Sequence, residues 1–93
     1  MWARVARFEG DPATIDERVA KLRTAVESGS LPAEVMDARF MMLVDRESGG
    51  ALGVTLFESE EAMRKADVLM NAGAGHAGSR SAVEFYEVPL HTL

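Results

Sequence analysis

The chain has 93 residues, of which 47% are hydrophobic, and it contains no cysteine. This length suits one domain spanning residues 1–93, and the absence of cysteine excludes disulfides and thiolate metal sites. The formal net charge of −5 disfavours binding to nucleic acid or to an anionic membrane surface, and no apolar run is long enough to span a bilayer. The N-terminus has no signal-peptide pattern, so we expect a cytoplasmic protein.

The first third of the chain predicts a strand followed by a helix. Residues 2–8 alternate with period two and include aromatic and branched side chains, as is typical of a strand. Asp11 and Pro12 are suited to begin a helix, because aspartate caps free N–H groups and proline has no N–H to leave unsatisfied. The helix is expected to run through Glu27 on an apolar stripe with helical spacing: Ile15, Val19, Leu22 and Val26.

The middle of the chain predicts a hairpin. Residues 36–45 are apolar on both faces, which favours a strand at the centre of a sheet. A glycine-bearing turn at 46–50 leads to a second strand over 51–57, in which Leu52 and Val54 belong to an alternating apolar set. Two such runs around a short turn form a β-hairpin.

The last third predicts a second helix and a final strand. Ser59 is suited to cap a helix over 60–72. One face of this helix carries Ala62, Ala66 and Leu69, with Met63 and Met70 beside it. A glycine-rich loop over 73–81 precedes a strand over 82–88, which Pro89 ends. The order therefore predicts an α+β, ferredoxin-like β-α-β-β-α-β domain, with a four-stranded antiparallel sheet and both helices on one face.

This predicted sheet has two apolar faces and only two helices to cover them. A whole apolar sheet face left in water would be an unusually large exposed patch. We therefore expect a homodimer that forms through the sheet faces. Alternation places Leu52, Val54 and Leu56 on one face and the out-of-phase Phe57 on the other. The alternative is a monomer in which one face of the sheet is partly exposed to solvent.

Three segments resemble the antibiotic biosynthesis monooxygenase-like, dimeric α+β barrel superfamily: residues 4–10 (RVARFEG), 43–49 (LVDRESG) and 53–62 (GVTLFESEEA). The resemblance covers nearly the whole chain. It implies a homodimer with a pocket in each subunit between the sheet and its helices. In this family the position of Phe57 turns toward the pocket, which implies that Leu52, Val54 and Leu56 face the partner. The superfamily includes cofactor-independent monooxygenases, heme-degrading enzymes and members without known activity.

The resemblance does not extend to the catalytic residues of these relatives. Heme-degrading relatives carry an asparagine on the first strand, a tryptophan ending the third strand and a histidine on the second helix. At those places this sequence has Arg4, Phe57 and Asp67, respectively. The histidines that quinone-forming relatives often carry along the second helix are also absent from residues 60–72. We therefore expect no heme and no other cofactor.

Residues 73–78 (GAGHAG) satisfy the G-x-G-x-x-G pattern, but they follow a predicted helix and precede a predicted strand. A dinucleotide-binding loop needs the reverse order, so a flexible connector is the better interpretation. His76 in this segment and His91 in the C-terminal tail are the only histidines. No set of Asp, Glu and His has the spacing of metal ligands, and we expect no metal.

The sequence favours a small domain that binds an apolar or aromatic molecule between its sheet and its helices. Candidate ligand-binding residues offer aromatic faces and one cation: Trp2, Arg4, Phe57 and Tyr86. A first alternative is a cofactor-independent oxygenase, in which Asp67 or His76 would be the base and Arg4 would stabilise the anion. A second alternative is a structural or interaction module without a ligand, in which side chains such as the methionines fill the interior.

Overall fold

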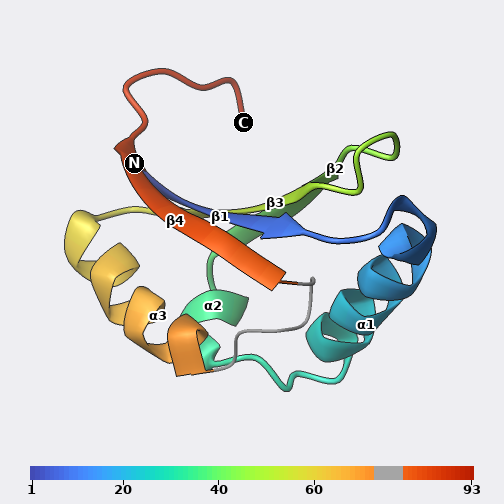
Figure 1. Cartoon of the computed structure of the whole chain (residues 1–93). Helices are drawn as coiled ribbons and strands as arrows, with labels where there is room; N and C mark the ends of the chain where they lie inside the picture. The colour runs from blue at the N-terminus through green and yellow to red at the C-terminus, as the bar shows by residue number, and fades with distance from the viewer. Residues whose placement is uncertain (73–78) are drawn as a thin grey trace.

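The computed structural model describes residues 1–72 and 79–93. Four strands form one antiparallel sheet in the order β2-β3-β1-β4, and the helices lie on one side of it (Figure 1). The elements in chain order are β1 (Trp2–Glu9), the 3-10 turn η1 (Pro12–Thr14), α1 (Ile15–Glu27), α2 (Ala33–Met36), β2 (Arg39–Val44), β3 (Ala51–Phe57), α3 (Glu60–Ala72) and β4 (Ser79–Glu87). This architecture confirms the predicted ferredoxin-like fold. The G-x-G-x-x-G motif, with His76, lies outside the described residues.

Both predicted caps form hydrogen bonds, but the first one caps the turn η1 rather than α1, which begins at Ile15 after an N-cap residue, Thr14, without a side-chain bond. Asp11 Oδ1 accepts a hydrogen bond from Ala13 N at 2.9 Å, and the short turn η1 separates this cap from the start of α1. Ser59 Oγ accepts from Ala62 N at 3.1 Å, which caps α3 as predicted. Both caps satisfy N–H groups that have no partner within the helix itself.

Strand β2 lies at an edge of the sheet, so the prediction that it is a central strand is wrong. Apolar side chains lie on both faces of this strand. Phe40 and Met42 are directed toward the helix side, whereas Met41 and Leu43 lie on the opposite face and remain 39% and 45% exposed. Apolar side chains on both faces therefore do not require that β2 be paired with a strand on each side.

The core beneath the sheet uses methionine and one alanine of α3 and no leucine of this helix. Met63 and Ala66 of α3 are fully buried against Phe57, and Trp2, Met70 and Phe85 pack around them. Ala62 and Leu69, which the sequence places on the packing face, are exposed instead. The long, unbranched methionine side chain fills the space between α3 and the sheet.

Helix α1 is anchored near the β2–β3 turn by a buried arginine. Its buried residues are Ile15, Arg18 and Ala25, whereas Val26 of the predicted stripe is exposed. Arg18 Nη2 donates to the carbonyl oxygen of Gly49 at 2.6 Å. This contact ties the helix to the turn that follows β2.

The strand register decides which side chains lie on the helix side of the sheet. Trp2 pairs with Phe57 and Arg4 pairs with Thr55 on the helix side, because Trp2 and Phe57 pack against α3 and Arg4 is bonded to it. The next positions along β1 and β3 point to the opposite face, which we call the open face. Leu52, Val54 and Leu56 lie on the open face, so their predicted opposition to Phe57 is confirmed.

A β-bulge interrupts the pairing of β1 with β4. Arg7 pairs with Ala82 and Phe8 pairs with Arg80, so Ser81 is the extra residue on β4. Strict alternation from Ala82 would place Ser81 opposite Phe8. The bulge puts Arg80 in that place instead, which brings its side chain to the end of α3.

Candidate functional site

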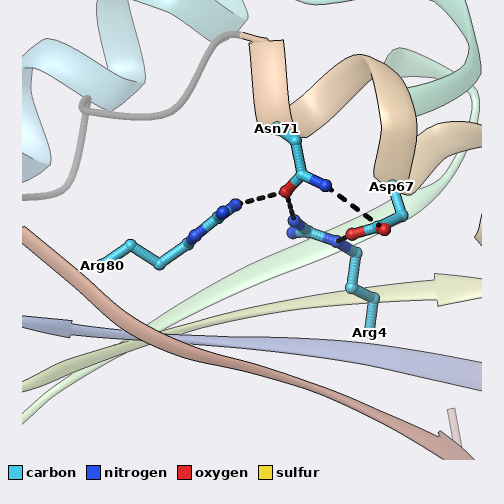
Figure 2. Close-up of polar contacts among 4 residues, drawn as sticks. All are labelled: Arg4, Asp67, Asn71 and Arg80. Carbon is cyan, nitrogen blue, oxygen red and sulfur yellow. Dashed lines mark hydrogen bonds and ion pairs between the residues drawn. The ribbon is translucent and has the colours of Figure 1, made fainter.

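The candidate site is centred on Arg4, which reaches from the middle of the sheet to α3 (Figure 2). Arg4 is only 2% exposed. Its Nε donates to Asp67 Oδ1 at 2.8 Å, and its Nη2 donates to Asn71 Oδ1 at 3.3 Å. These two residues are four apart on α3, so one face of the helix presents both acceptors to the same guanidinium group.

Asn71 joins a second arginine to this group. Its Oδ1 also accepts a hydrogen bond from Nη1 of Arg80, and its Nδ2 donates to Asp67 Oδ2 at 3.4 Å. Figure 2 shows Arg80 approaching Asn71 from β4, on the side away from Asp67. We call Arg4, Asp67, Asn71 and Arg80 the arginine cluster. Its formal charge is +1, because it contains two guanidinium groups and one carboxylate, and the acceptor that both arginines share is the neutral Asn71.

Thr55 contributes a buried hydroxyl next to the arginine cluster. It pairs with Arg4 on one side and with Phe40 on the other, so the three side chains share the helix side of the sheet. Thr55 is fully buried, and its Oγ1 has no hydrogen-bond partner among the described residues. Such a group is unusual, since buried polar atoms are nearly always hydrogen-bonded.

Aromatic side chains surround these polar groups. Phe85 is the β4 partner of Arg4, and Trp2 and Phe57 lie two residues along their strands from Arg4 and Thr55. The guanidinium carbon of Arg64 lies 4.1 Å from the centroid of the Phe85 ring, which is a cation–π distance. The helix side of the sheet therefore combines flat apolar surfaces with a small group of hydrogen-bond donors.

Four of the residues selected from the sequence come together in the structure. Trp2, Arg4, Phe57 and Asp67 all lie between the sheet and α3. Tyr86 does not join them. It pairs with Ala3 on the open face, is 47% exposed and donates its hydroxyl to Glu84.

Tyr86 belongs to an exposed polar group that also contains Arg7 and Glu84. Arg7 Nε forms an ion pair with Glu84. The hydrogen bonds from Tyr86 and Arg7 lower the pKa of the Glu84 carboxyl. The same contact with Glu84 raises the pKa of the Tyr86 hydroxyl. These residues form a surface feature on the far side of the sheet from the arginine cluster.

The remaining histidine in the described part of the chain, His91, lies in the tail after β4, where its Nδ1 accepts from Leu93 N at 3.3 Å. Within residues 1–72 and 79–93, no group of three His, Cys, Asp or Glu side chains is placed to hold a metal ion. Within the same residues, no helix has the length and apolarity needed to cross a membrane.

A depression of about 380 Å³ lies at the other end of β1 from Arg4, beside the β2–β3 turn. Its lining mixes both faces of the sheet and includes Arg7, Phe8, Leu43 and Leu52. It has no buried polar atom without a partner comparable to Thr55 Oγ1 among the described residues. We therefore consider the arginine cluster and Thr55 the better candidate site.

Sequence reasoning missed Thr55, Asn71 and Arg80. Thr55 sits in an alternating strand pattern where a threonine is ordinary, and its significance comes only from its complete burial beside Arg4. Asn71 could have been found by its position four residues after Asp67 on the predicted helix. Arg80 could not have been placed, because the bulge at Ser81 breaks the alternation that would predict its face.

Comparison with known proteins supports the fold. No protein-family model matches the chain, and no curated protein sequence matches it. Among solved structures, the chain resembles a protein from Chloroflexus aurantiacus J-10-fl named as an antibiotic biosynthesis monooxygenase, with a TM-score of 0.60, 11% identity, and coverage of 99% of this chain and 95% of that chain.

Two further solved structures agree. A variant of SnoaB from Streptomyces nogalater, described as a cofactor-independent oxygenase, gives a TM-score of 0.60 at 23% identity and covers 97% of this chain and 94% of its own. Another antibiotic biosynthesis monooxygenase gives 0.55 at 18% identity, with 96% and 100% coverage. The chain therefore has the fold of the antibiotic biosynthesis monooxygenase-like superfamily, as its sequence resemblance implies.

Proposed function

We propose that the protein binds a small, flat and largely apolar molecule between its sheet and its helices. The observation that carries this proposal is the hydroxyl of Thr55, which is fully buried beside Arg4 without a partner in the described part of the chain. Leaving such a group unsatisfied costs about 1–3 kcal/mol. A ligand that hydrogen-bonds to Thr55 would offset that cost.

The side chains around Thr55 support a flat apolar ligand. Phe40 and Phe57 lie on the same face of the sheet as Thr55, and Met63 and Met70 approach this face from α3. Aromatic rings provide flat contact surfaces, and methionine adapts to irregular shapes. Small-molecule sites in proteins combine such apolar walls with a few polar groups that fix orientation.

A cofactor-independent oxygenase is the second candidate, favoured by the structural likeness to SnoaB. Such a reaction needs a base to remove a proton from the substrate and a cation to stabilise the resulting anion. Asp67 and Arg4 are the pair that could serve. Asp67 Oδ1 is held by Arg4 at 2.8 Å, so the base would be Oδ2, whose contact with Asn71 is longer, at 3.4 Å.

Native mass spectrometry of the purified protein tests the binding proposal. We expect a mass excess from a small molecule that is released when the protein is unfolded in organic solvent. Trp2 gives a second readout, because it is the only tryptophan and packs against Phe57. A neutral aromatic probe, 2-naphthamide, should quench its fluorescence in a saturable way. A bare protein whose Trp2 emission does not respond would show that its own side chains fill the interior, and would overturn the proposal.

We also propose that the protein is a homodimer formed through the open face, as the superfamily resemblance implies. Met41 and Leu43 at the edge strand are exposed, and Val54 lies on the same face between Val5 and Met41. Contact with the open face of a second copy would remove these side chains from water. Two sheets can pack face to face at about 10 Å.

A further inference from the structure

We infer that the ligand carries an ionised oxygen, as a carboxylate, a phenolate or an enolate does, and that Arg4 and Thr55 receive this oxygen while Arg80 adds positive charge beside it. This inference rests on the proposed function and specifies the chemical class of its ligand. It differs from a purely apolar site in assigning the polar end of the ligand a negative charge.

The charge of the arginine cluster is the first support. Arg4 and Arg80 together carry two positive charges, and the one negative charge of the cluster is Asp67, which is bonded to Arg4 but not to Arg80. Arg4 is almost completely buried, and a buried charge is costly unless it is well compensated. Arg4 and Asp67 balance each other, and the excess positive charge comes from the exposed Arg80 at the edge of the cluster. The protein as a whole has a net charge of −5, so this local excess of positive charge runs against its general composition. An anionic ligand would neutralise that excess.

The unused donors are the second support. Arg4 uses Nε and Nη2 for Asp67 and Asn71, and its Nη1 takes part in neither of these bonds. Thr55 offers a hydroxyl donor on the neighbouring strand, without a partner among the residues that the structure describes. An anionic oxygen accepts several donors at once, and charge-assisted hydrogen bonds are roughly twice as strong as neutral ones. A neutral carbonyl would use these donors less well.

The third support is that the cluster is held in place before a ligand arrives. Asp67 and Asn71 act as positioning residues, because each fixes a different nitrogen of Arg4. Asn71 is itself oriented, since its amide donates to Asp67 and its oxygen accepts from both arginines. Arg80 reaches this arrangement through the bulge at Ser81. A preorganised guanidinium group can bind an anion without first losing conformational freedom.

The test compares two probes of the same shape, 2-naphthoate and 2-naphthamide, by isothermal titration calorimetry. Only the first carries a negative charge. We expect wild-type protein to bind 2-naphthoate about tenfold more tightly than 2-naphthamide, because a hydrogen bond to a charged group contributes more than a neutral one. Arg80→Gln should reduce the affinity for 2-naphthoate severalfold and leave the affinity for 2-naphthamide nearly unchanged. Thr55→Val should weaken the binding of 2-naphthoate more than that of 2-naphthamide, because the charged oxygen makes the stronger hydrogen bond.

Arg23→Gln is the matched control, because it removes the same charge from an exposed position on α1. It should change neither affinity. Equal binding of both probes by the wild type would overturn the anionic ligand and leave the proposed function intact. Binding of neither probe at millimolar concentration would contradict the proposed function and the inference with it. An equal loss in Arg23→Gln and Arg80→Gln would show a long-range charge effect, and would also overturn the assignment.

Discussion

Thr55 carries a hydroxyl at a position where stability alone would favour a hydrocarbon. Replacing it with valine keeps the branched shape and removes a buried polar atom that has no partner in the described residues. We expect Thr55→Val to increase the free energy of unfolding of the ligand-free protein by about 1 kcal/mol, measured by urea denaturation. Thr24→Val on the exposed side of α1 is the control and should change it by less than about 0.5 kcal/mol. A clear loss of stability in Thr55→Val would mean that the hydroxyl is already satisfied.

Glu84 gives a prediction about pH. A hydrogen bond from Tyr86, which has the largest effect, and one from Arg7 lower the pKa of its carboxyl from the usual value of 4.5. A lowered pKa in the folded state means that the stabilisation is present above the unfolded pKa and is lost as the pH falls through the folded pKa. An NMR titration should place the Glu84 midpoint below 4.5 and show that Tyr86→Phe raises it. Carboxyl groups far from Tyr86 serve as internal references, and an unchanged Glu84 midpoint in the variant would contradict the assigned cause.

The sequence predicts part of the candidate site, and the limits are physical. Arg4, Phe57 and Asp67 stand out because the sequence resemblance draws attention to their positions. Tyr86 was grouped with them by its chemistry, but its register opposite Ala3 puts it on the open face. Successive side chains along a strand point to opposite faces of the sheet. Residue type alone therefore cannot assign a strand residue to a site.

In the turns, Gly49 and Gly29 allow the backbone strain of replacing a glycine to be distinguished from the steric clash. Both have a positive φ, 84° for Gly49 and 68° for Gly29, which L-amino acids other than glycine rarely adopt. A Cβ at Gly49 would lie 2.1 Å from the carbonyl oxygen of Gly10, whereas a Cβ at Gly29 would have nothing within 4 Å. The two positions share the backbone strain and differ in the steric clash.

We expect Gly29→Ala to lower the free energy of unfolding by about 1 kcal/mol, the usual cost of a left-handed residue. Gly49→Ala should lower it by about 3 kcal/mol or more, because the turn must also move away from Gly10 and release the contact of Arg18 with the Gly49 carbonyl. Thermal and urea unfolding of both variants measure the difference. Equal losses would show that backbone strain alone matters and that the turn adjusts freely.

The helices and strands were predicted best where local signals are strongest. The bounds of α3 and β3 agree with their predicted ranges, because Ser59 marks the start of the helix and clear alternation marks the strand. Helix α2 was missed, since its four residues are too few to show a period. The position of β2 at the sheet edge was also mispredicted, because apolar side chains on both faces of a strand do not reveal whether both of its backbone edges are paired.

For the whole molecule, the proposed dimer can be tested at the middle of the open face. Val54 pairs with Val5 on one side and Met41 on the other. Val54→Asp would place a carboxylate in an apolar interface, which costs several kcal/mol and should weaken the dimer about 100-fold or more. Light scattering and sedimentation should show a dimeric wild type and a monomeric or aggregating variant.

Val68→Asp is the control for this experiment, because Val68 is highly exposed on α3, an element on the other side of the sheet. This variant should remain as dimeric as the wild type. A monomeric wild type would refute the dimer. A wild type and a Val54→Asp variant that are equally dimeric would keep the dimer but exclude the open face as its interface.

The strand order also has a consequence for synthesis on the ribosome. Strand β1 leaves the ribosome first, yet it lies between β3 and β4 in the finished sheet. Trp2 can pair with Phe57 and with Glu87 only after these later residues have been synthesised. Strands β2 and β3, by contrast, can pair across a short turn as soon as they emerge. Distant pairings of this kind close slowly, because a long loop must be ordered first. Arg4 therefore reaches Asp67 only late in translation, and the nascent chain exposes an unpaired central strand until then.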